Sequence, residues 1–148
     1  MDYEKKRKAL KLLAMVVWYI GFIALALKSY KLFSEAYSLD SNLSLMALFL
    51  LIGFLLSLLK TKYIFRKSCK TNLLRIDLLE EPKIWNFYRI EFFIFLIMVI
   101  SLGAFLSHSA SGNYYFLVLV GMVDMALALA LLFSGIEFFL SYKIKNLE

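Results

Sequence analysis

The chain has 148 residues, of which 62% are hydrophobic and 17% aromatic, and its formal net charge is +6. A soluble domain of this length needs a polar surface that this composition does not supply, so the composition excludes an ordinary water-soluble fold. The apolar residues form continuous blocks long enough to cross a bilayer, unlike the alternating segments of a membrane barrel. The sequence therefore predicts an all-α integral membrane protein, a four-helix transmembrane bundle in one domain over residues 1–148.

The single Cys, Cys69, and the single His, His108, limit the possible chemistry. A lone Cys cannot form a disulfide within the chain or hold an iron–sulfur cluster, and a lone His cannot supply both ligands of a bis-histidine haem. The sequence contains no HExxH, GxSxG, P-loop or GxGxxG motif. We therefore expect no catalytic site, cofactor or metal centre, and predict that the protein is not an enzyme.

The first predicted span covers about residues 9–27 and follows the basic head MDYEKKRK. A basic head also begins a secretory signal, but this apolar run exceeds the ~7–15 residues typical of signals, which favours a spanning helix. Residues 28–42 are read as a polar connection, and Asp40, Ser41 and Asn42 at its end are good N-caps. These caps predict that the second span, about residues 43–65, begins directly after them.

Residues 66–85 form the longest polar segment, and their apolar residues fit neither one helix face nor one strand face. We expect this segment to lie on the membrane surface, with Cys69 in a basic loop. Glu80 to Pro82 predicts a helix start, because Pro is tolerated in the first turn and carboxylates suit the positive end of the helix dipole.

The third predicted span covers about residues 85–107, and the fourth covers about 114–140. The small polar residues of SHSASGN, 107–113, predict a tight turn between them. Short connections in such a bundle make consecutive helices antiparallel neighbours. We therefore expect the first span to pack on the second, and the third on the fourth.

The basic residues are distributed unevenly along the chain. All but two of the 17 Lys and Arg residues lie in the N-terminal head, around the 66–85 segment, or in the tail at Lys143 and Lys145; the exceptions are Lys28 and Lys31. The positive-inside rule then places both termini in the cytoplasm, and we expect the plasma (inner) membrane as the location. The basic face would attract anionic lipid headgroups. A nucleic acid partner is not expected, because no nucleic-acid-binding fold or aromatic–basic platform is present.

Asp124 is the one carboxylate in the middle of the fourth span, ten residues after Tyr114. At that position it would lie about 15 Å into a hydrocarbon core about 30 Å thick. A carboxylate there costs on the order of 2.5–3.5 kcal/mol, which a partner must offset. Gly121, Ala128 and Gly135 share its helix face at heptad spacing. Small residues allow close helix approach, so we expect Asp124 to face a helix interface.

In the predicted spans, Tyr19 and Ser101 lie at about the same membrane depth as Asp124. We therefore expect their hydroxyl groups to donate hydrogen bonds to Asp124. No Lys or Arg falls at this depth in the predicted spans, so the sequence predicts no salt bridge for Asp124 within one chain. Desolvation would then favour the neutral acid. Glu137 falls at the cytoplasmic edge, where we expect it to be solvated or to face lipid.

Two pairs of small residues are further candidates for helix packing: Gly53 with Ser57, and Gly103 with Ser107. Each pair has the small-x3-small spacing that lets two helix backbones approach closely, although this spacing is also common by chance. His108 lies between serines in the outer turn, where a polar surface role is expected.

Two classes of function fit these features. The favoured one is a non-catalytic accessory or interaction subunit that acts through helix packing and its basic cytoplasmic face, because the interior is nearly devoid of polar groups. The alternative is a small oligomeric transporter or channel in which Asp124 handles a proton or cation. A bundle this small encloses little volume, so we expect a homo-oligomer or a subunit of a larger membrane complex.

Overall fold

The computed structural model describes residues 3–144 and is helical in every regular element of that range. The elements are α1 (Tyr3–Leu39), α2 (Leu43–Lys60), a π-helical turn (Thr61–Phe65), α3 (Arg66–Asp77), a 3-10 turn (Ile84–Phe87), α4 (Ile90–Ala110), α5 (Tyr114–Ser134) and α6 (Ile136–Ile144). Four segments are long and apolar enough to cross a membrane: Tyr3–Leu39, Leu43–Asp77, Ile90–Ala110 and Tyr114–Ser141. The predicted all-α class with four such helices is confirmed. Lys145 of the predicted tail lies outside the described residues.

Helix α1 is much longer than the predicted first span. Residues 28–39 continue it instead of forming a polar connection. This stretch contains neither Gly nor Pro, and its residues Leu32, Phe33 and Ala36 are buried in a core cluster with residues of α5. Burial of this apolar face stabilises the extra turns, since tertiary packing supplies most helical stability. Lys28 consequently lies in the interior of a helix.

Helix α2 begins where the predicted caps place it. The Asn42 side-chain oxygen accepts a hydrogen bond from the Leu45 backbone N–H at 3.2 Å, which satisfies a donor of the first turn. After Lys60 the chain stays helical, because the π-helical turn and then α3 follow directly. The second span is therefore one long helical segment that reaches Asp77.

The expectation that residues 66–85 lie on the surface with Cys69 in a loop was wrong. Cys69, Leu73 and Ile76 are buried on one face of α3, in a core cluster that includes Leu10 and Ala14 of α1. These α3 positions follow helical spacing, so together they form an apolar face. Packing of this face against α1 explains why the segment is a helix rather than a surface loop.

The helix start predicted at Glu80 to Pro82 was also wrong, because α4 begins only at Ile90. The intervening chain is held by side chains of α3. The Asn72 amide donates to the Phe87 carbonyl at 2.9 Å, and Arg75 donates to the Asn86 carbonyl at 2.5 Å. These bonds satisfy backbone oxygens outside the helix, and so stabilise the irregular path.

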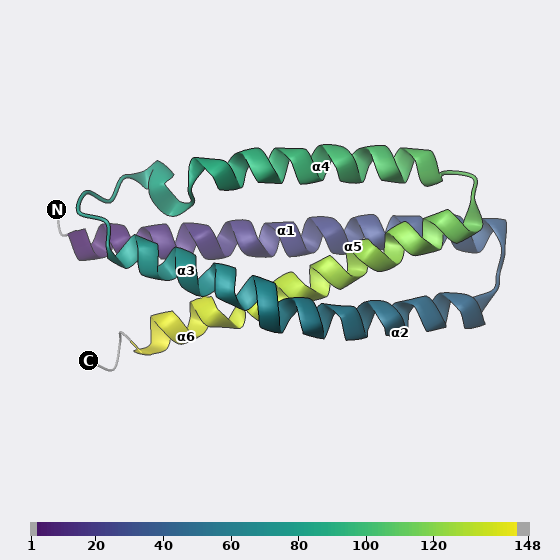
Figure 1. Cartoon of the computed structure of the whole chain (residues 1–148), viewed down its shortest axis with the longest axis horizontal. Coiled ribbons are helices and arrows are strands. Elements are labelled where there is room, and N and C mark those ends of the chain that lie inside the picture. Colours follow the sequence, from purple (N-terminus) through teal and green to yellow (C-terminus); the bar gives the residue numbers. More distant parts are fainter. Residues whose placement is uncertain (1–2, 145–148) are drawn as a thin grey trace.

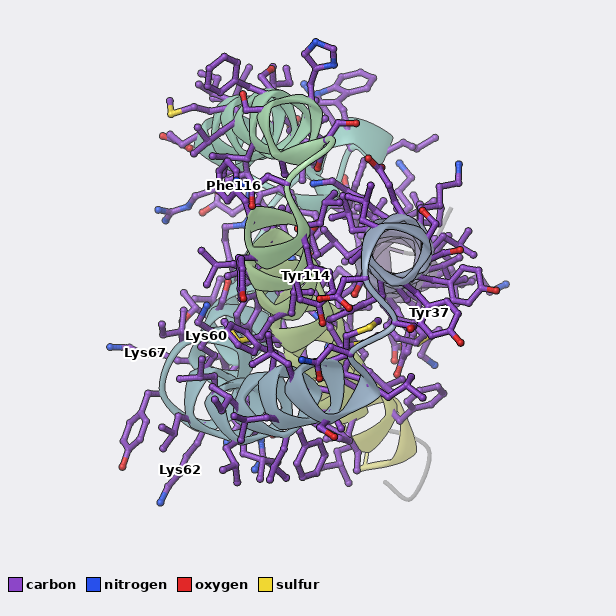
Figure 2. All side chains as sticks on the ribbon, turned by 90° about the vertical axis from the view of Figure 1, so that its right-hand side faces the viewer. Tyr37, Lys60, Lys62, Lys67, Tyr114 and Phe116 are labelled. Carbon is purple, nitrogen blue, oxygen red and sulfur yellow. The ribbon has the colours of Figure 1, made fainter. Side chains whose placement is uncertain are left out.

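Helix α5 occupies the middle of the bundle. Figure 1 shows α4 along one side and α2 along the other, and the end-on view of Figure 2 shows α5 between them with α1 beside it. The expected pairing of the first and second spans was wrong, because α2 packs on α5 and not on α1. Helix α4 is peripheral: Ala110 is its only buried residue among its described side chains.

The connections alternate between the two ends of the bundle. Helix α1 begins and α6 ends at the same end as the segment between α3 and α4 (Figure 1). At the other end, residues 111–113 form the tight turn between α4 and α5. Gly112 takes a left-handed φ of 81°, and the Asn113 side chain accepts a hydrogen bond from the Phe116 N–H. The turn is therefore shorter than predicted, because α4 continues to Ala110.

Candidate functional site

The Asp124 carboxylate forms an ion pair with Lys28, so the prediction that it lacks a salt bridge within the chain was wrong. The Lys28 Nζ lies 3.0 Å from Asp124 Oδ2, and the Asp124 side chain is only 8% exposed. The prediction failed because α1 continues past the expected span. Lys28 and Asp124 then lie at similar distances from the same end of two antiparallel helices.

Lys28 also reaches a third helix. Its ammonium donates a hydrogen bond to the Gly103 carbonyl of α4 at 2.9 Å, while Asp124 Oδ2 receives no well-directed hydrogen bond. A Cβ on Gly103 would lie 3.0 Å from Nζ, so the absence of a side chain makes room for the ammonium. Lys28 of α1 is therefore joined to α5 by an ion pair and to α4 by a hydrogen bond to a backbone carbonyl.

The small-residue face of α5 lies against α1 around this pair. The Ser29 hydroxyl donates to the Gly121 carbonyl at 2.8 Å, and a Cβ on Gly121 would lie 3.1 Å from the Phe33 ring. Ala128 is fully buried, and a Cβ on Gly135 would lie 2.6 Å from the Tyr19 hydroxyl. The close approach of the two helices depends on these positions having little or no side chain.

The two donors nominated for Asp124 lie elsewhere. The Tyr19 hydroxyl is next to Gly135, and its ring centroid lies 6.1 Å from that of Phe139. Ser101 is exposed on α4. Lys28, which was expected in a polar connection, is instead the partner of Asp124, through an ion pair.

The remaining small residues fall into two groups. A Cβ on Gly53 would lie 3.1 Å from the Met122 side chain, so Gly53 allows α2 to pack closely on α5. Ser57 is fully buried, but its hydroxyl donates to the Phe54 carbonyl of its own helix. Ser107 similarly donates to the Gly103 carbonyl of its own helix.

A second ion pair involves Glu137, for which a solvated or lipid-facing position was expected. Glu137 is 6% exposed, and its Oε1 lies 2.7 Å from Arg66 Nε, while Oε2 lies 3.9 Å from Lys70 Nζ. The continuation of α2 into α3 brings these bases, one helical turn apart, over α6. The four-residue spacing of Arg66 and Lys70 can be seen in the sequence, but it places both side chains on one face only if the segment is helical.

Buried polar contacts near this second pair are structural. The Trp18 Nε1 donates to the Ser134 Oγ and to the Leu131 carbonyl, each at 3.0 Å. Cys69 is fully buried in the same core cluster as Trp18. A buried thiol in apolar surroundings is inert, so Cys69 has a structural role.

The first turns of α1 are tied to the end of α3. Lys11 Nζ lies 2.8 Å from Asp77 Oδ2, and Arg7 donates to the Leu79 carbonyl at 2.7 Å. Within residues 3–144, no group of three or more His, Cys, Asp or Glu side chains is placed to hold a metal ion. The polar side chains described so far are therefore engaged mainly in joining helices to one another.

Comparisons with protein-family models, with curated proteins and with solved structures give no match. The class of protein therefore rests on the helices themselves. An all-helical chain with four helices long and apolar enough to cross a bilayer indicates a membrane protein.

Proposed function

We propose that the chain is a four-span integral membrane protein that acts as a non-catalytic interaction subunit. One observation carries the proposal: the Asp124 charge is paired with Lys28, which also binds the Gly103 carbonyl. Intramembrane charges are expensive and often functional. Here, the charge holds α1, α4 and α5 together, which favours a structural role for the carboxylate.

Helix α4 offers the surface for a partner. Many of its exposed residues are large and apolar, with Ile97, Met98 and Phe105 each more than 60% exposed. Lipid or another transmembrane helix covers such a face in a membrane. Because α1 and α2 cover other sides of α5, a partner helix that docks on α4 would complete the bundle on its open side.

The proposed orientation places both termini and the segment between α3 and α4 in the cytoplasm. The supporting observation is that the start of α1, the end of α6 and the segment between α3 and α4 lie at one end of the bundle (Figure 1), and that most of the Lys and Arg residues belong to or flank these parts of the sequence. The positive-inside rule assigns such an end to the cytoplasmic side of the plasma membrane.

Native mass spectrometry after mild extraction of the tagged protein from its own membrane tests the subunit proposal. We expect a second polypeptide in fixed ratio, lost in Met98→Trp on α4 but retained in Leu51→Trp. Leu51 is a matched control because it is 57% exposed on α2. A homogeneous monomer or homo-oligomer would contradict the proposal.

A transporter or channel is the second candidate, and the exposure of Lys28 favours it. The Lys28 side chain is 28% exposed beside the buried carboxylate, so a proton or cation could replace the ammonium at Asp124. In liposomes, Asp124→Asn should then abolish proton-coupled flux. Flux that persists unchanged in this variant would remove Asp124 from the mechanism.

A further inference from the structure

A cleft of about 420 Å³ opens between the long α2–α3 segment and the start of α4. Three of its lining residues are the cations Lys67, Arg75 and Arg89, and none of its lining residues is acidic. Lys67 is exposed on α3 and points away from the bundle in Figure 2. The cleft is therefore a concentration of positive charge at the proposed cytoplasmic end.

The nearby acids only partly balance this charge. Glu91 interacts electrostatically with Arg75 but does not line the cleft. A second hollow adjoins the first through Lys67 and adds Lys62 to the positive surface; its other bases, Arg66 and Lys70, are next to Glu137. The excess positive charge favours an anionic ligand.

The cleft wall also contains donors that the protein does not use. The Arg75 Nε and the Tyr88 hydroxyl are buried and have no hydrogen-bond partner among the described residues. Tyr88 is 5% exposed and lines the cleft. Burial raises the pKa of Tyr88, so its phenol remains a protonated donor. Unused donors beside guanidinium groups suit a ligand with several acceptor oxygens.

The same cleft has an apolar side. Ile64 and Phe92 contribute to its lining, and Ile90 and Ile94 beside it on α4 are 74% and 58% exposed. The apolar surface continues along α4 toward the middle of the bundle. The site therefore places a charged end next to a strip that would lie in the hydrocarbon of a membrane.

We propose that this cleft binds one anionic phospholipid, with its phosphate at Arg75, Arg89 and Lys67. One acyl chain lies beside Ile64 and Phe92, along the start of α4. Basic pockets between helices on the cytoplasmic side are suited to such headgroups. The proposal rests on the proposed membrane orientation, but does not require a protein partner.

The purified full chain in a neutral detergent, titrated with phosphatidylglycerol and followed by native mass spectrometry, tests the proposal. We expect one tightly retained phosphatidylglycerol, and weaker binding of phosphatidylcholine. Replacing two cleft cations in Lys67→Gln/Arg89→Gln should weaken phosphatidylglycerol binding by roughly thirtyfold. The control Lys5→Gln/Lys83→Gln removes the same charge from exposed positions outside the cleft, and should bind nearly as well as the unmodified protein.

Three results would overturn the lipid assignment. If phosphatidylglycerol binding falls equally in the two double variants, the lipid is attracted by the net charge of the protein and not by the cleft. Equal retention of phosphatidylcholine would remove the role of the anionic headgroup. Thermal stabilisation by inorganic phosphate equal to that by phosphatidylglycerol would assign the cleft to a free anion. Because only the isolated chain is used, these outcomes are independent of whether a partner subunit exists.

Discussion

The pairing of Lys28 with Asp124 is the contact on which most of the functional interpretation depends. Removing one member of a buried ion pair leaves an uncompensated charge, which costs more than the pair itself contributes. The Lys28 ammonium also satisfies the Gly103 carbonyl. A single substitution at Lys28 therefore affects three helices.

Lys28→Met should destabilise the fold by about 3–5 kcal/mol, because it leaves the Asp124 carboxylate buried and unpaired. The double variant Lys28→Met/Asp124→Leu should recover most of this loss, since neither charge then remains. Lys31→Met is the matched control, because Lys31 is exposed on the same helix. Thermal unfolding in detergent micelles measures all three. A double variant no more stable than Lys28→Met would rule out the pair as the cause.

The burial of Tyr88 leads us to expect a loss of folding stability at high pH. Burial raises its pKa in the folded protein, so above about pH 10 the folded state binds more protons than the unfolded state. This contribution to stability is present below pH 10 and is lost as the pH rises. Between pH 8 and pH 11, the unfolding temperature should fall further in the unmodified protein than in Tyr88→Phe. Tyr63→Phe, at a 66% exposed position, should leave the fall unchanged.

At the residue scale, the sequence was sufficient to identify Asp124 but not its partner. Placing Asp124 in the middle of an apolar run required only a residue count, because the only other charge in the run, Glu137, lies near its end. Choosing Lys28 over Tyr19 required knowing that α1 continues through residues 28–39. That continuation depends on packing against α5, which no local pattern in α1 reveals.

The helices themselves were predictable where a cap marks their ends. Asn42, one of the three caps expected from the sequence, starts α2, because its side chain satisfies a backbone donor of the first turn. Helix α3 was not predicted, because its buried face is not a regular pattern of apolar residues. Its buried face includes Cys69 and Asn72 together with Leu73 and Ile76. A search for apolar side chains that leaves out Cys69 and Asn72 does not detect the helical spacing of this face.

The contact between α2 and α5 provides a test at the level of elements. Gly53→Leu should cost about 1–3 kcal/mol by overpacking, since even a Cβ at Gly53 would lie 3.1 Å from Met122 and 3.2 Å from its carbonyl. Ala104→Leu adds a larger apolar side chain at an exposed position of α4 and should be nearly neutral. Comparison of the unfolding temperatures checks this; equal effects would mean that the α2–α5 contact tolerates expansion.

For the whole molecule, the number of apolar helices followed from the sequence, but their arrangement did not. Short connections suggested that consecutive spans pack together, yet α2 packs on α5. The choice between neighbours depends on which faces fit, such as Gly53 against Met122 or Gly121 against Phe33. Such pairs become visible only when two distant segments are placed together.

The proposed orientation predicts how the two ends of the bundle react with a membrane-impermeant maleimide. In a Cys69→Ala background, Ser41→Cys should be labelled from outside intact cells. Lys83→Cys should be labelled only after the membrane is opened, because the segment between α3 and α4, to which Lys83 belongs, lies at the other end of the bundle (Figure 1). Both positions are exposed. Labelling in the reverse order would invert the topology, and labelling of both in intact cells would argue against a spanning arrangement.

The central position of α5 has a consequence for biosynthesis. Ribosomes make the chain from its N-terminus, so α1, α2 and α4 leave the ribosome before the helix on which all three pack. Until α5 arrives, Lys28 has no carboxylate beside it, and the small-residue contacts of α1 and α2 have no surface to meet. Assembly of the bundle must therefore wait for the last span. Chains that terminate before residue 114 should be recognised as incomplete and degraded.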